Sequence, residues 1–170
     1  MLRPVLQYPD PRLTQKAEAV EEITDEIREL AQDLMDTLTT IGGVGIAAPQ
    51  IGVFKRVIVL DVSQGLNNPD APQEFVPLIN PVVTVLDPAP HEENEGCLSV
   101  PGRSGTVERP ERVKVRAADR NGGPVELVGQ GMLAVALCHE IDNLDGVVYV
   151  DKMIEDVSDR YKQVKGENRA

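Results

Sequence analysis

The chain has 170 residues, a length that we expect to form one domain around a single hydrophobic core. Its net charge of −11 argues against a protein that binds the nucleic-acid backbone through clustered lysines and arginines, and 3% aromatic residues argue against base stacking. Two cysteines make no disulfide framework, which favours a reducing, cytoplasmic location. The first residues lack a signal-peptide core, and the longest apolar run, 132–137, is too short to cross a bilayer. We therefore expect no membrane partner.

The N-terminal part of the chain predicts an arm, a helix and a strand. Prolines 4, 9 and 11 indicate that residues 1–22 are extended. Thr24 is suited to cap a helix that ends before the glycine pair 42–43. The apolar face of this helix has a spacing of three or four residues and contains Ile27, Leu30, Leu34, Met35 and Leu38. A glycine-rich stretch at 42–52 follows, and then a strand over 56–62.

The rest of the chain predicts several strands and one buried helix. We expect a loop at 63–77, a strand at 78–86, an acidic loop, and a turn at Pro101 and Gly102. Strands are expected at 103–107 and 111–118, followed by a hairpin turn at Asn121 and Gly122. A helix over 131–146 precedes a last strand at 147–150. This order indicates an α+β fold, with one domain over 1–155 and a polar tail over 156–170 that is a frayed helix or disordered.

His139 and Glu140 lie in the expected C-terminal helix and have the residue types of a metal hydrolase. Residues four apart share a helix face, so His-Glu-x-x-His places two imidazoles on one metal while the glutamate acts as base toward its water. Here Asn143 occupies the second histidine position. For these residues alone, a hydrogen-bonded core histidine is an equal alternative.

Two other segments carry candidate chemical groups. Cys97 follows a glutamate and a glycine in the segment 95–99, and its thiolate is a natural ligand for Zn²⁺ or Fe(II). The alternative is a small buried apolar residue. Residues 43–50 end in Gln50, whose amide can donate to a developing oxyanion, whereas the alternative is a tight strand connection. This segment is not a phosphate loop, because it lacks the Gly-Lys-Ser/Thr ending.

Together, and in this order, the three segments resemble the peptide deformylase family. They read GVGIAAPQ at 43–50, EGCLS at 95–99 and CHEIDN at 138–143, and the resemblance extends to YPDPRL at 8–13 and YVD at 149–151. The family has Gln-His-Glu-x-Asp-His in the third segment, so Cys138 and Asn143 depart from it. The resemblance implies mixed or antiparallel sheets around a central helix that carries the third segment, with an additional N-terminal helix.

The resemblance also implies a role for each matching residue. Cys97 and His139 match two metal ligands, and Asn143 stands at the third. Glu140 matches the catalytic acid and base, while Gln50 and the backbone N–H of Leu98 match the oxyanion donors. The residues that match substrate-binding positions are Gly43, Gly45, Ile46, Glu95 and Gly96. The implied cofactor is one divalent metal, Fe(II) first and Ni, Co or Zn as alternatives. The implied substrates are N-formyl-methionyl nascent peptides, with a transient ribosome contact as a further expectation.

Asn143 leaves three interpretations open. The chain is a working or weakened deformylase, a deformylase fold that binds peptide N-termini or a partner without catalysis, or a deformylase inactivated by design. An amide oxygen is a hard, neutral ligand that suits Ca²⁺, Mg²⁺ or Mn²⁺ better than Fe(II) or Zn²⁺. Neither His91 nor Asp142 is expected to replace the missing imidazole, and Cys138 is expected to pack in the core.

Overall fold

The computed structural model describes residues 1–158 except 67 and 69, and it combines two helices with one antiparallel sheet. The helices are α1 (Asp25–Ile41) and α2 (Met132–Leu144). The strands are β1 (Gly45–Ala47), β2 (Val57–Asp61), β3 (Phe75–Cys97), β4 (Val100–Ala118), β5 (Pro124–Gln130) and β6 (Glu155–Asp156). Short 3₁₀ helices are η1 (Pro11–Thr14), η2 (Ala48–Ile51), η3 (Val62–Gly65) and η4 (Tyr149–Asp151). The predicted α+β class is confirmed.

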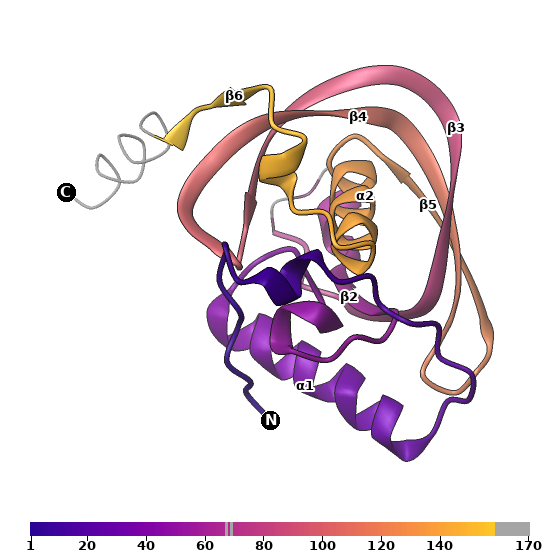
Figure 1. Cartoon of the computed structure of the whole chain (residues 1–170). Coiled ribbons are helices and arrows are strands. Elements are labelled where there is room, and N and C mark those ends of the chain that lie inside the picture. Colours follow the sequence, from indigo (N-terminus) through magenta and orange to yellow (C-terminus); the bar gives the residue numbers. More distant parts are fainter. Residues whose placement is uncertain (67, 69, 159–170) are drawn as a thin grey trace.

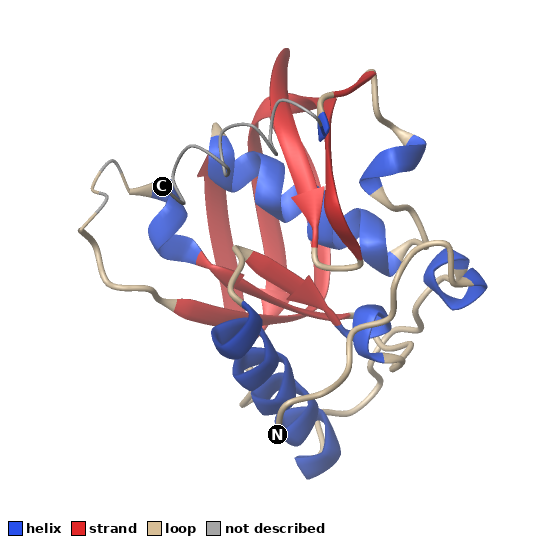
Figure 2. Cartoon of the chain, turned by 90° about the vertical axis from the view of Figure 1, so that its left-hand side faces the viewer, coloured by secondary structure: helices blue, strands red, loops and turns tan. Residues whose placement is uncertain are grey.

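The sheet has the order β1-β2-β3-β4-β5, and β6 pairs with β4. Long β3 and β4 curve around α2, while α1 lies at the other end of the molecule, beside β2 (Figure 1). Figure 2 shows the strands of this sheet in red. Among the described residues, no helix is both long and apolar enough to span a membrane.

Strand β2 is buried along its whole length because a helix covers each of its faces. Ile58 and Leu60 pack in the core cluster that contains the apolar residues of α2. Val57 and Val59 point the other way, into the cluster that contains the apolar face of α1. The alternation of side chains along a strand explains why an almost continuous apolar run serves two cores.

The predicted acidic loop after residue 86 and the predicted turn at Pro101 and Gly102 are both wrong. Strand β3 continues to Cys97, and the turn lies at residues 98–99, because Cys97 and Val100 are paired. Register shifts around Asp87 accommodate the prolines of this stretch, so the ladder with β4 continues beyond them. Residues 82–90 are exposed, including Val82, Val83 and Val85, and the backbone of this stretch pairs with β4.

The C-terminal predictions are confirmed for the helix and wrong for the last strand. Helix α2 matches the prediction for 131–146, and the turn after β4 lies at the predicted Asn121 and Gly122. Residues 147–150 form no strand, because Val148 and Asp151 hydrogen-bond to each other around η4. The first tail residue, Asp156, belongs to β6. The predicted disorder of 159–170 and part of the predicted loop at 63–77 fall outside the described residues.

Candidate metal and active site

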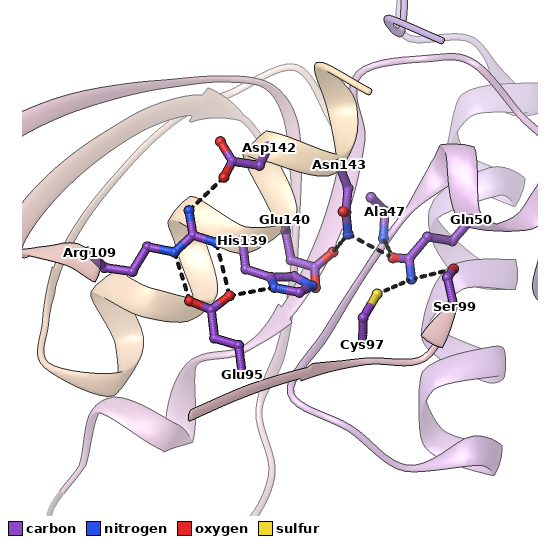
Figure 3. Close-up of polar contacts among 10 residues, drawn as sticks. All are labelled: Ala47, Gln50, Glu95, Cys97, Ser99, Arg109, His139, Glu140, Asp142 and Asn143. Carbon is purple, nitrogen blue, oxygen red and sulfur yellow. Dashed lines mark hydrogen bonds and ion pairs between the residues drawn. The ribbon is translucent and has the colours of Figure 1, made fainter. Parts of the chain in front are cut away.

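One cavity of about 970 Å³ joins the three segments that the sequence singled out. Its walls come from the entry to β1, the end of β3 with the following turn, and α2. The side chains of Gln50, Cys97, His139, Glu140 and Asn143 gather in one corner (Figure 3). The three motifs are therefore neighbours in space, although 93 positions separate Gln50 from Asn143 in the sequence.

His139 is held by a carboxylate on one side of its ring. Its Nδ1 lies 2.8 Å from Oε1 of Glu95, and the ring of Tyr149 stacks beside it with centroids 6.2 Å apart. Burial alone would lower the pKa of His139, but its contacts with Cys97 and Glu95 raise that pKa above the ordinary value. Because Nδ1 is engaged by Glu95, the Nε2 atom is the one available to a metal.

A buried ion-pair network anchors this carboxylate. Arg109 on β4 contacts both oxygens of Glu95, at 2.7 and 2.9 Å, and a third nitrogen contacts Asp142 (Figure 3). The side chains of Arg109 and Glu95 are each only 3% exposed. Burial raises the pKa of Glu95, but the bonds from Arg109 and His139 outweigh it and lower that pKa. Sequence reasoning missed Arg109, because a single arginine in a strand carries no local signal of a partner 14 positions away.

Gln50 is oriented by the backbone of its own turn. It lies in η2, and its Oε1 accepts a hydrogen bond of 2.8 Å from the N–H of Ala47. Its Nε2 donates to Ser99 Oγ at 3.1 Å and to Cys97 Sγ at 3.4 Å. The amide therefore presents N–H groups toward the thiol, as a donor to an oxyanion would.

Glu140 is buried beside these groups, with 5% of the residue exposed. Burial raises the pKa of Glu140 to about 7, which suits a group that both accepts and returns a proton near neutral pH. Gly45 allows this carboxylate to approach β1, because a Cβ there would lie 2.9 Å from Glu140 Cγ and 2.7 Å from Leu60 Cδ2. Asn143 donates from Nδ2 to Glu140 Oε2 at 3.4 Å and to Gln50 Oε1 at 3.4 Å.

The residues matched to substrate binding divide into three kinds. Gly43, Gly45 and Gly96 line the cavity, as does Leu98, whose backbone N–H was matched to an oxyanion donor. Ile46 does not line it: its side chain is buried in the core beneath α1, so only its backbone can meet a ligand. Glu95 borders the cavity, but its carboxylate is committed to Arg109 and His139, which favours a positioning role. Among the described strands, β1 pairs only with β2, so its other edge is free to receive an extended peptide.

Two side chains of the site are suitable ligands for a divalent metal. The thiol of Cys97 and the Nε2 of His139 are suitable ligands for a transition metal, and the Glu95 contact supplies the support typical of a ligating histidine. Within the described ranges, however, no three His, Cys, Asp or Glu side chains are arranged to hold a metal ion. His91 contacts Glu93 and Glu111 instead, and half-buried Cys138 packs against the core.

Comparison with known proteins shows which family the chain resembles. The family model described as "Polypeptide deformylase" matches residues 2–159. The peptide deformylase of Cellvibrio japonicus is 45% identical over 88% of this chain and 85% of that protein. That of Lachnoclostridium phytofermentans is 47% identical over 85% of this chain and 84% of that protein.

A solved structure agrees in fold as well as in sequence. The Met-Ala-Ser-bound peptide deformylase of Acinetobacter baumannii is 35% identical and superposes with a TM-score of 0.81, covering 90% of this chain and 99% of that one. The solved structure shares the overall fold of this chain. The chain belongs to the polypeptide deformylase family.

Proposed function

We propose that this chain is a metal-dependent peptide deformylase, which hydrolyses the formamide at the N-terminal methionine of newly made proteins. The observation that carries the proposal is the gathering of Gln50, Cys97, His139 and Glu140 near the free edge of β1, with the last three lining the cavity. The relative from Acinetobacter baumannii binds Met-Ala-Ser, a peptide of the expected product type. The presence of both Glu140 and Gln50 favours catalysis over simple peptide binding.

Two residues are proposed to hold the metal, and three groups to act on the substrate. Cys97 and His139 would ligate the metal, which when bound supplies Lewis acidity and a water of lowered pKa. Glu140 accepts a proton from the attacking water and returns it to the amine as the C–N bond breaks. Formate and a free N-terminus result. The Nε2–H of Gln50 and the backbone N–H of Leu98 donate to the oxyanion that forms on the formyl oxygen.

The cavity offers a site for the methionine side chain. Its apolar lining includes Ile41, Leu98, Met132 and Val135, close to Glu140. The peptide backbone would add to the free edge of β1 at Gly45 and Ile46, as extended peptides do at exposed strand edges. Gly43 and Gly96 line the cavity without a side chain, which leaves room for the peptide.

The finer expectations concern the metal and the cellular setting. Thiolate and imidazole ligands suit Fe(II), which we propose as the resident metal, with Ni, Co or Zn as alternatives. The substrate is produced by translation, so we propose a cytoplasmic location and a transient encounter with the ribosome. The ribosome expectation comes from the family resemblance, and residues 159–170 of the tail lie outside the described residues.

Formate release from N-formyl-Met-Ala-Ser tests the proposal. The chain is loaded anaerobically with Fe(II) or Ni(II), and N-acetyl-Met-Ala-Ser serves as the control substrate. Formate should appear only from the formyl peptide. Glu140→Gln keeps the shape but removes the base, so its turnover should fall by about 10²–10⁴-fold at matched metal content. No formate from the loaded chain would overturn the function, and unchanged turnover in Glu140→Gln would overturn that residue's role.

A further inference from the structure

We infer that Asn143 is a hydrogen-bond donor that ties Gln50 to Glu140, and that the metal is held by only two protein atoms, Cys97 Sγ and His139 Nε2. The inference rests on the proposed function for its metal, but it concerns what is particular to this chain. Asn143 stands where the family resemblance implies a third imidazole ligand. Its surroundings decide whether its carbonyl oxygen can replace that imidazole.

A backbone contact fixes the orientation of the Gln50 amide. The backbone N–H of Ala47 can only donate, and it lies 2.8 Å from Gln50 Oε1. This contact identifies the oxygen of the Gln50 amide, and its nitrogen then faces Cys97 and Ser99. Gln50 Oε1 is therefore an acceptor that points toward Asn143 (Figure 3).

The orientation of Asn143 follows from its two neighbours. One terminal atom of its amide lies 3.4 Å from Gln50 Oε1 and also 3.4 Å from Glu140 Oε2. Gln50 Oε1 can only accept, and ionised Glu140 also accepts, so this atom is the nitrogen, which carries two N–H donors and no lone pair suited to a metal. Turning the amide over would set its oxygen against two oxygens and remove both hydrogen bonds. All three residues are buried, with at most 5% of each residue exposed, so water has little access to replace those bonds.

Among the described residues, no third His, Cys, Asp or Glu side chain is arranged with Cys97 and His139 to hold a metal ion. Asp142, one residue before Asn143, contacts Arg109 and Lys152 instead. Both ring nitrogens of His91 contact carboxylates. Catalytic zinc-type sites normally have three protein ligands. We therefore expect this chain to bind its metal more weakly than a variant with histidine at 143, while Asn143 keeps Gln50 and Glu140 in register.

Zinc affinity of the full chain tests this without any substrate. Metal-free protein competes with a chromogenic chelator for Zn²⁺ in four forms: unchanged, Asn143→Leu, Asn143→Ala and Asn143→His. Leucine matches the shape of asparagine but has neither donor nor ligand atom, and alanine checks that bulk does not set the result. We expect both apolar variants to bind within about threefold of the unchanged chain. Asn143→His should bind at least about 100-fold tighter, because changing even a supporting residue shifts affinity about 10–100-fold.

The Co²⁺-loaded forms give a second readout. The thiolate-to-cobalt absorption should be the same in the unchanged chain and in Asn143→Leu, and Cys97→Ser should abolish it. A tenfold or greater loss of affinity in both apolar variants, or a changed cobalt spectrum, would show that Asn143 is a ligand. Equal affinity of the unchanged chain and Asn143→His, or no binding at millimolar Zn²⁺, would overturn the two-ligand site. Failure of the proposed function would instead appear as absent formate with metal bound.

Discussion

Replacing Arg109 by methionine should strongly destabilise the fold and loosen His139. The side chains of Arg109 and Glu95 are each 3% exposed, so the substitution leaves a carboxylate buried without its cation. Breaking a buried ion pair on one side costs about 3–5 kcal/mol. For a chain of this length, each kcal/mol lowers Tm by about 2–4 °C, so we expect a drop of about 6–20 °C. Because Glu95 also holds Nδ1 of His139, metal affinity should fall about 10–100-fold.

A matched control lies on the same strand. Arg116 pairs with Glu126 at 3.2 Å, but the two side chains are 70% and 53% exposed. Arg116→Met should therefore cost at most about 1 kcal/mol. Urea unfolding of the metal-free proteins, followed by circular dichroism, measures both losses. The double variant Glu95→Gln/Arg109→Met should regain part of the stability, because it buries no lone charge. If Arg109→Met were no less stable than Arg116→Met, the reasoning about the buried network would be refuted.

The surroundings of Cys138, Gly45 and Tyr149 each predict the result of a simple measurement. Burial raises the pKa of Cys138 to about 11 from 9.0. At neutral pH its thiolate population is therefore about 100-fold smaller than that of a free cysteine. Alkylation of Cys138, followed by mass spectrometry, should be correspondingly slow. Rapid labelling of the native protein at Cys138 would contradict this environment. Gly45→Ala should push Leu60 and Glu140 apart, because its Cβ would lie too close to both. We expect a loss of about 1–3 kcal/mol in urea unfolding and a lower rate of formate release. An unaltered rate would show that β1 moves to accommodate the methyl group. The buried hydroxyl of Tyr149 has no hydrogen-bond partner among the described residues, so Tyr149→Phe should melt at the same temperature or higher, and a clear loss of Tm would reveal a missing partner.

The helices and the residues of the site could be predicted from the sequence because their signals are local. The apolar spacing around Leu30 and Leu34 needs only one helix face, and α1 has the predicted bounds. His139 and Asn143 lie four residues apart in one helix, so their common face follows from helical geometry. The gathering of Gln50 and Cys97 beside them followed from the family resemblance, which carries information about distant pairing that spacing does not contain.

The features that were missed depend on contacts between distant segments. Strand β3 continues past Asp87 because β4 pairs with it, and its polar, proline-containing sequence has no intrinsic strand pattern. Arg109 gains its role only when that hairpin brings it over Glu95. The same holds for Asn143: its residue type suggested a poor ligand, but only the fixed amide of Gln50 defines which of its atoms faces the site.

The most direct test compares formate release by the unchanged chain and by Asn143→His over a range of Ni(II) concentrations. Our account predicts that both proteins release formate from N-formyl-Met-Ala-Ser once metal is saturating, because Glu140 and Gln50 are in place in both. The unchanged chain should need at least about 100-fold more free metal to reach half of its maximal rate, as expected for a site short of one ligand. Formate release by the histidine variant alone, at every metal concentration, would contradict the claim that this chain is a working deformylase.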